Sequence, residues 1–118
     1  MEALRKLEVW RRACRLSAKV FRLLATSREF AFRDQLSRSA LSIASNIAEG
    51  YGRDSRLERI QFLRYAKASC NEAWTQIYIG IDAEIVDARS ASALADETLE
   101  ISKMTGGLIR YIETSENR

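Results

Sequence analysis

Few side chains in this sequence are suited to catalysis. Its 118 residues include no histidine, so the commonest general base and metal ligand is missing. The remaining candidates are the carboxylates of Glu49, Glu58 and Glu72, if neighbouring helices bring them together, and the thiol of Cys70. Each is explained more simply as part of a polar cluster or as a thiol in the core. We therefore predict a protein that is not an enzyme and has no catalytic residues.

Patterns that hold metals or cofactors are also missing from the sequence. A di-iron helical bundle needs Glu-x-x-His pairs, which cannot occur here. The segment Gly50-Tyr51-Gly52 lacks the spacing and the following lysine of a phosphate-binding loop. Cys14 and Cys70 lie far apart with no CxxC pair, which favours reduced structural thiols over a disulfide or a metal site. We predict no metal site, no cofactor and no small-molecule substrate.

Basic side chains are concentrated in the first half of the chain. Residues 1–64 carry fourteen basic and seven acidic side chains, net +7, whereas residues 65–118 carry five basic and nine acidic ones, net −4. Such a surface either binds phosphates or an acidic partner, or is simply a solvated face, which we favour slightly. The near absence of acidic residues one turn away supports the binding alternative. The candidate nucleic-acid-binding residues are Arg5, Arg12, Arg15, Lys19, Arg22, Arg53 and Arg56.

A polar stripe forms a second candidate site, on the segment 35–53. Apolar residues at helical spacing give this segment one buried side. The opposite side carries small and amide side chains where a solvated helix would carry Lys and Glu. These side chains either satisfy backbone groups near the helix end or in an adjacent subunit, which we favour, or bind a ligand or RNA group. The cluster consists of Gln35, Arg38, Ser42, Asn46 and Glu49.

The elements that must position these residues are predicted to be helices. The chain has no proline and only five glycines, which favours long uninterrupted helices over a loop-rich fold. Apolar periodicity places four of them at about 4–25, 33–49, 56–86 and 92–113. With short connections, they predict one domain over residues 1–118, an all-α, antiparallel, up-down-up-down four-helix bundle.

Glycines and a capping motif mark the ends and contacts of these helices. Gly50 and Gly52 are expected to end the second helix in a backbone conformation with positive φ. Ser55 and Glu58 form a capping box at the start of the third helix. Gly80 lies inside that helix, where glycine is unfavourable unless a neighbouring helix approaches closely. We therefore expect close packing at Gly80.

The segment 35–50 also resembles a family signature. Its sequence, QLSRSALSIASNIAEG, is similar to the pattern Q-L-R-R-A-A-x-S-I-x-x-N-I-A-E-G of the four-helix-bundle proteins encoded by intervening sequences of 23S rRNA genes. Ser37 and Ser39 depart from it. The matching positions are Gln35, Leu36, Arg38, Ala40, Ser42, Ile43, Asn46, Ile47, Ala48, Glu49 and Gly50. Similarity continues at Leu7, Val9, Trp10, Phe62, Leu63, Ala66, Ser69 and Glu72, and so covers most of the chain.

The resemblance implies a four-helix bundle in an RNA context. It also implies self-assembly into a homo-oligomer, with a ring-like pentamer preferred. Together with the basic half-chain, it predicts a protein that binds RNA or ribonucleoprotein. The alternative is a protein-interaction scaffold or adaptor, such as a retroelement accessory protein that partners a reverse transcriptase. No leader or membrane segment is visible, so we expect a cytoplasmic protein that does not enter the membrane.

Overall fold

The computed structural model describes residues 1–115, which are mostly helical. A short helix, α1 (Glu2–Arg5), precedes four long ones. These are α2 (Glu8–Leu24), α3 (Phe30–Tyr51), α4 (Arg56–Asp82) and α5 (Ala88–Ser115). No strand occurs in this part of the chain, so the prediction of an all-α protein with four long helices is confirmed. Within residues 1–115, no helix is both long and apolar enough to cross a lipid bilayer.

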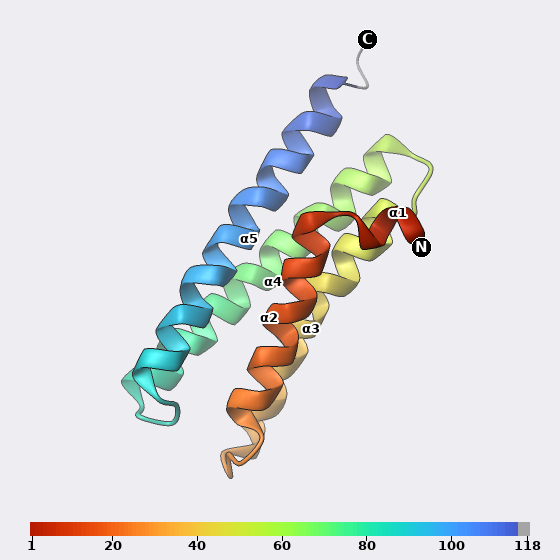
Figure 1. The fold of residues 1–118 in the computed structure, drawn as a ribbon. Helices are drawn as coiled ribbons and strands as arrows, with labels where there is room; N and C mark the ends of the chain where they lie inside the picture. The colour runs from red at the N-terminus through yellow and green to blue at the C-terminus, as the bar shows by residue number, and fades with distance from the viewer. Residues whose placement is uncertain (116–118) are drawn as a thin grey trace.

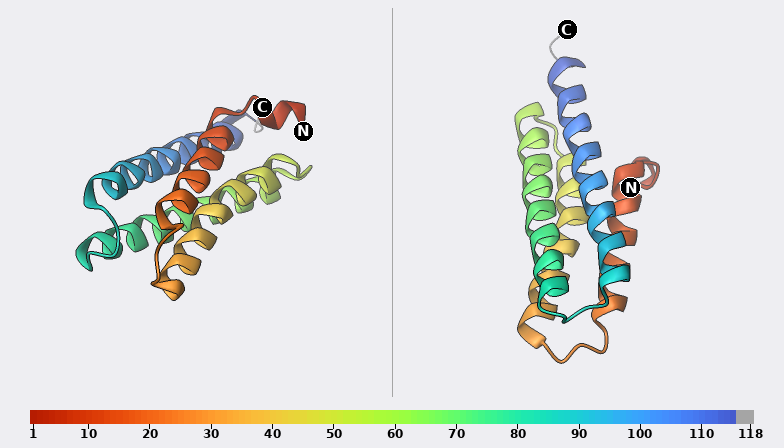
Figure 2. Two further views of the ribbon diagram at one scale, coloured as in Figure 1. Left: turned by 60° about the horizontal axis from the view of Figure 1, so that its bottom comes forward. Right: turned by 90° about the vertical axis from the view of Figure 1, so that its left-hand side faces the viewer.

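The four long helices lie side by side around one core (Figure 1). The contacts of α3 with α4 and of α4 with α5 are the most extensive, and α2 packs less extensively against α3 and α5. Each long helix thus has two principal neighbours. The connections 25–29 and 83–87 lie at one end of the bundle, and the connection 52–55 lies at the other (Figures 1 and 2). This arrangement is compatible with the predicted antiparallel bundle.

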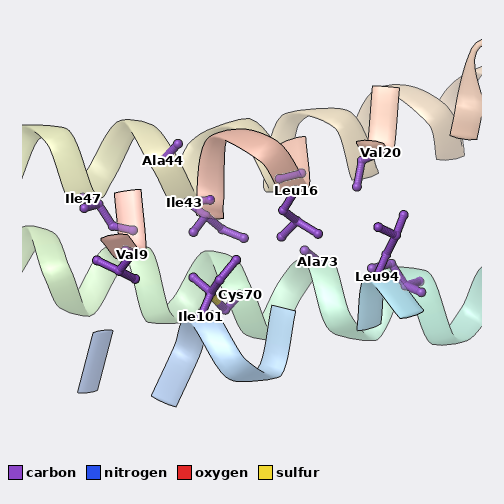
Figure 3. Close-up of a cluster of buried hydrophobic side chains, with 14 of the residues drawn as sticks. Val9, Leu16, Val20, Ile43, Ala44, Ile47, Cys70, Ala73, Leu94 and Ile101 are labelled. Atoms are coloured by element: carbon purple, nitrogen blue, oxygen red, sulfur yellow. The ribbon is translucent and has the colours of Figure 1, made fainter. Parts of the chain in front are cut away.

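All four long helices contribute side chains to the core (Figure 3). The buried hydroxyls of Thr98 and Thr105 donate to carbonyl oxygens one turn earlier in α5, at 2.7 and 2.8 Å. The buried hydroxyl of Ser17 in α2 has no hydrogen-bond partner among the described residues. The apolar core includes Leu16, Val20, Ile43, Ile47, Cys70, Ala73, Leu94 and Ile101. Burial of this surface provides the main driving force for folding.

The helix boundaries differ most from the predicted ones in four places. The helix predicted at 4–25 is divided, because Leu7 adopts an extended backbone (φ −79°, ψ 111°) between α1 and α2. The second long helix begins one turn earlier, at Phe30. The third ends at Asp82 instead of 86, and the chain turns through Glu84 with a φ of 59°. The last begins at Ala88 instead of 92, because the carboxylate of Asp87 accepts the first-turn amide of Ser90 at 2.9 Å.

The glycines act through packing and not through unusual backbone angles. The prediction of positive φ is wrong for Gly50 and Gly52, since α3 continues through Gly50 and neither residue has a positive φ. A Cβ on Gly50 would lie 3.1 Å from the carbonyl oxygen of Arg59 in α4. Close approach is confirmed at Gly80, where a Cβ would lie 2.6 Å from Cζ of Phe32. Close packing against a neighbouring element therefore explains Gly50 and Gly80.

The predicted start of α4 is confirmed at its capping residue. The Ser55 hydroxyl accepts a hydrogen bond from the Glu58 amide at 3.3 Å. This bond satisfies one of the first-turn amides that a helix leaves without a partner. The carboxylate of Glu58 lies 3.8 Å from the guanidinium of Arg53, in the connection that precedes α4. Ser55 thus fixes the point at which the chain re-enters the bundle after α3.

Candidate nucleic-acid interface

An unpaired basic row lies on the exposed side of α2. It consists of Arg15, Lys19 and Arg22, which are four and three residues apart and therefore share one side of the helix. All three side chains are exposed. Within residues 1–115, no carboxylate forms an ion pair with any of them. These three cations, called here the α2 row, are available to an external anion.

Arg12 was predicted to belong to this surface, but the structure gives it a different role. Its Nε and Nη2 donate to the two carboxylate oxygens of Glu97 in α5, at 2.9 and 2.6 Å. Nη1 also lies 3.4 Å from Sδ of Met104. The hydrogen bond from Arg12, supported by the charges of Lys19 and Arg15, lowers the pKa of the Glu97 carboxyl. Arg12 therefore ties α2 to α5 and is not free to bind a phosphate.

Arg53 is also engaged within the molecule. Its Nη2 donates to Oε2 of Glu49 at 2.7 Å, and its guanidinium lies over the ring of Phe62, 4.7 Å from the ring centroid. With the longer contact to Glu58, these interactions hold Arg53 across the connection between α3 and α4. The assignment of Arg53 to a free basic surface therefore needs correction.

The structure does not bring the other two predicted cations to the α2 row. Arg56 is partly buried as the first residue of α4 and forms no ion pair with residues 1–115. Its helix is not a principal neighbour of α2. Arg5 lies on α1 and is exposed, 3.9 Å from the carboxylate of Glu2. The predicted basic residues therefore form one continuous row on α2 and separate side chains elsewhere.

The polar stripe of α3 is divided between internal contacts and solvent. The hydroxyl of Ser42 forms a hydrogen bond with that of Ser69 in α4. The Asn46 side chain donates to the Ser42 carbonyl oxygen at 2.9 Å, one turn earlier. Glu49 pairs with Arg53, as described above. These contacts satisfy polar groups within the molecule, as expected if the stripe stabilises the fold.

Gln35 and Arg38, the other two members of the stripe, are exposed. They line a shallow hollow of about 250 Å³ that also includes Ser42 and Glu72. Arg38 in addition lines a larger groove, of about 550 Å³, between α2 and α3. Sequence reasoning missed this groove, in which Phe21 and Leu41 are half-exposed beside Arg38. Arg22 does not line this groove, because it borders a separate hollow between α2 and α5.

The candidate catalytic groups are placed in unreactive surroundings. Burial raises the pKa of the Cys70 thiol to about 12, so this thiol is protonated at neutral pH and is a poor nucleophile. Glu49 and Glu58 are both within ion-pair distance of Arg53. Glu72 lies four turns along α4 from Glu58 and is exposed. The chemistry that this arrangement favours is the binding of anions by the α2 row, in which Lys19 and Arg22 line a hollow between α2 and α5.

Comparisons with known proteins agree with this fold. Residues 5–107 match the model of a family described as 23S rRNA-intervening sequence protein. A crystal structure from Bacteroides thetaiotaomicron, of a protein with unknown function from the S23 ribosomal protein family, has a TM-score of 0.81 and 24% identity. The match covers 86% of this chain and 97% of that one, and it shows a shared fold. No curated protein sequence matches the chain significantly.

Proposed function

The chain belongs to the 23S rRNA-intervening sequence protein family, and we propose that it binds RNA or ribonucleoprotein through the α2 row. In this proposal it is a non-enzymatic, cytoplasmic protein and an antiparallel, up-down-up-down bundle. It assembles with copies of itself, preferably as a pentamer. The observation that carries the RNA proposal is the exposure of Arg15, Lys19 and Arg22, none of which forms an ion pair with residues 1–115.

Free cations are better suited to phosphate binding than paired ones. A paired arginine such as Arg12 would have to break its two charge-assisted hydrogen bonds to Glu97 before it could contact a phosphate. The α2 row needs no such exchange, and its two arginines can bind phosphate oxygens bidentately. The first and last cations of the row are seven positions apart, or about 10 Å along the helix. Phosphate contacts carry no sequence information, so we expect the binding to tolerate different RNA sequences.

The first prediction concerns the salt dependence of RNA binding. The triple variant Arg15→Gln/Lys19→Gln/Arg22→Gln removes the α2 row, and we expect it to bind RNA more weakly. Each lost phosphate contact lowers the slope of log affinity against log salt by about 0.7 on a single strand, so the slope should fall by about 2. Fluorescence anisotropy with a labelled transcript of a 23S rRNA intervening sequence, measured at several salt concentrations, gives both quantities.

A matched control separates the α2 row from the net charge. The variant Arg89→Gln/Lys103→Gln/Arg110→Gln makes the same change in charge on α5, at exposed residues without an ion pair in the described part of the chain. We expect it to keep most of the affinity and nearly all of the slope. Equal losses in the two triple variants, or no binding by the wild-type protein at low salt, would contradict the proposed RNA interface.

The alternative function is that of a scaffold or adaptor for other proteins, such as a reverse transcriptase. The observation that favours it is the apolar groove between α2 and α3, because exposed apolar surface with a charged rim is typical of protein interaction sites. We place RNA first because the α2 row offers three unpaired cations and the family name refers to rRNA.

A further inference from the structure

The hollow that borders the α2 row has both charged and apolar walls, and it is called here the α2/α5 hollow. The cations in its lining belong to the row, and its apolar side chains come from both helices. Its volume of about 400 Å³ falls in the range of about 300–1,000 Å³ that is typical of sites for small molecules. It is therefore large enough for a group of many atoms and not only for a single ion. The lining consists of Lys19, Arg22, Leu23, Ser90, Ala93 and Leu94.

The contact between Arg12 and Glu97 holds the two walls of the hollow together. Its two hydrogen bonds, at 2.9 and 2.6 Å, join α2 to α5. Arg12 lies two turns before Lys19, and Glu97 lies two turns after Ser90, so the contact is close to the hollow along both helices. A site whose walls are fixed in advance loses less entropy when a ligand binds.

Every charged side chain in the lining is positive. Lys19 and Arg22 are exposed and form no ion pair with residues 1–115. Arg15 extends the row by one turn. Arg89, which directly precedes Ser90, is exposed and also has no ion pair in the described part of the chain. The hollow therefore attracts an anionic group.

The carboxylates nearest in sequence to Ser90 and Ala93 lie outside the lining. Asp87 accepts the amide of Ser90 at 2.9 Å, and Glu97 is paired with α2 as described above. Asp96 lies one turn from Ala93 and is exposed, but it does not line the hollow. A ligand in the hollow would contact the two cations directly and would meet no carboxylate in the lining.

The apolar part of the lining distinguishes between anionic ligands. Leu94 is buried and Leu23 is half-buried, and both contribute to the hollow beside the cations. A free phosphate or an RNA duplex would contact only the cations, because the bases of a duplex are paired and stacked inside it. An unpaired nucleotide offers a phosphate to the cations and the apolar face of a base to the leucines. Of these ligands, the unpaired nucleotide alone uses both parts of the lining.

We propose that the α2/α5 hollow binds one unpaired nucleotide of a single-stranded RNA. This inference rests on the proposed RNA binding through the α2 row and names the form of RNA that the row recognises. Lys19 and Arg22 hold a phosphate of the nucleotide, and its base lies against Leu23 and Leu94. Because every base has an apolar face, the contact tolerates different sequences and requires only that the base is unpaired.

The second prediction compares single-stranded with duplex RNA. The probes are a short unstructured RNA and the same strand annealed to its complement, at equal salt concentration. We expect the wild type to bind the single strand about tenfold more tightly, because the loss of one base contact commonly has an effect of this size. A surface that recognised only phosphates would favour the duplex, whose charge density is higher.

A variant that fills the hollow tests whether this preference arises there. Ala93→Leu adds bulk at an exposed residue of the lining, with neither a charge nor an aromatic ring on which a base could stack. We expect it to weaken single-strand binding about fivefold and to leave duplex binding unchanged. Its salt slope should match that of the wild type, because both cations remain. Ser92→Leu, at an exposed residue of α5 outside the lining, is the matched control and should bind like the wild type.

Failure of the nucleotide site and failure of the RNA interface give different results. Equal affinity of the wild type for single strand and duplex, or equal effects of Ala93→Leu and Ser92→Leu, would overturn the nucleotide site alone. No RNA binding at low salt would contradict both proposals. A short polyglutamate peptide that binds more tightly than the RNA, and that Ala93→Leu weakens, would instead identify an acidic protein segment as the ligand and overturn the inference. Circular dichroism verifies that both variants are folded.

Discussion

At the scale of single residues, the contrast between Arg12 and Arg15 is the most informative. The two arginines are three positions apart on α2 and look alike in the sequence. Arg12 forms a two-pronged contact with Glu97, and its side chain is only 27% exposed, whereas Arg15 is exposed and has no ion pair in residues 1–115. The amphipathic pattern of α2 predicts a basic side. Which arginine on that side forms an ion pair within the molecule depends on the position of Glu97 in α5.

The third prediction concerns the contribution of Glu97 to stability. The variant Glu97→Gln removes the carboxylate and leaves the partly buried Arg12 without its charged partner. We expect a loss of about 1 kcal/mol at neutral pH, at the low end for a hydrogen-bonded charged pair, because both groups keep some contact with water. Chemical denaturation measures the loss. Glu72→Gln, at an exposed acid of α4 without an ion pair in the described residues, is the matched control.

The contribution of Glu97 has a defined pH dependence. Its pKa is lowered in the folded state, mainly by the hydrogen bond from Arg12. The stabilisation is therefore fully present above the unfolded-state pKa, about 4.3 for glutamate, and is lost as the pH falls through the lowered folded-state pKa. We expect the stabilities of the wild type and of Glu97→Gln to converge below that range. A difference that stays constant down to pH 2 would contradict an ionic role for the pair.

At the scale of elements, the glycines show what the sequence leaves open. Gly50 follows an apolar helical segment, so its position is typical of a helix C-terminus. The structure uses the same residue to bring α3 against α4, and helix α3 ends later, at Tyr51. A glycine near a predicted helix end fits both roles, and the choice between them depends on a partner helix. Gly80 lies within the apolar pattern that predicts a helix over 56–86, so its position indicates close packing and not a helix end. The structure confirms this prediction.

The fourth prediction compares two glycines within helices. Gly50→Ala would place its Cβ 3.1 Å from a backbone oxygen of Arg59 and 3.2 Å from Cβ of Phe62. Neither atom belongs to a flexible side-chain end, so we expect a net destabilisation of about 1 kcal/mol despite the better helix propensity of alanine. Gly107→Ala meets only Nη2 of Arg110, at 3.8 Å, and should stabilise by about 0.5 kcal/mol. Thermal or chemical denaturation measures both changes, and equal effects would contradict the packing role.

At the scale of the whole molecule, the sequence predicts the class of fold well and the surfaces less well. The periodicity of the apolar residues identifies four long helices and most of the core, because both follow from local spacing. The two-sided charge distribution is also visible in the net charges of the half-chains. The α2/α3 groove could not be predicted, since it combines residues from two helices. Whether Phe21 is buried or half-exposed depends on how α3 lies beside α2.

The modest packing of α2 has a dynamic consequence. This helix carries the α2 row and one wall of the groove, yet it is held less extensively than α3 and α4 are held to one another. Local opening is easiest where the least surface must be exposed. As a fifth prediction, we expect backbone amides of α2 to exchange with deuterium before those of α4. Bound RNA should slow that exchange, because it contacts the α2 row. Deuterium exchange of the α2 amides would therefore measure RNA binding directly.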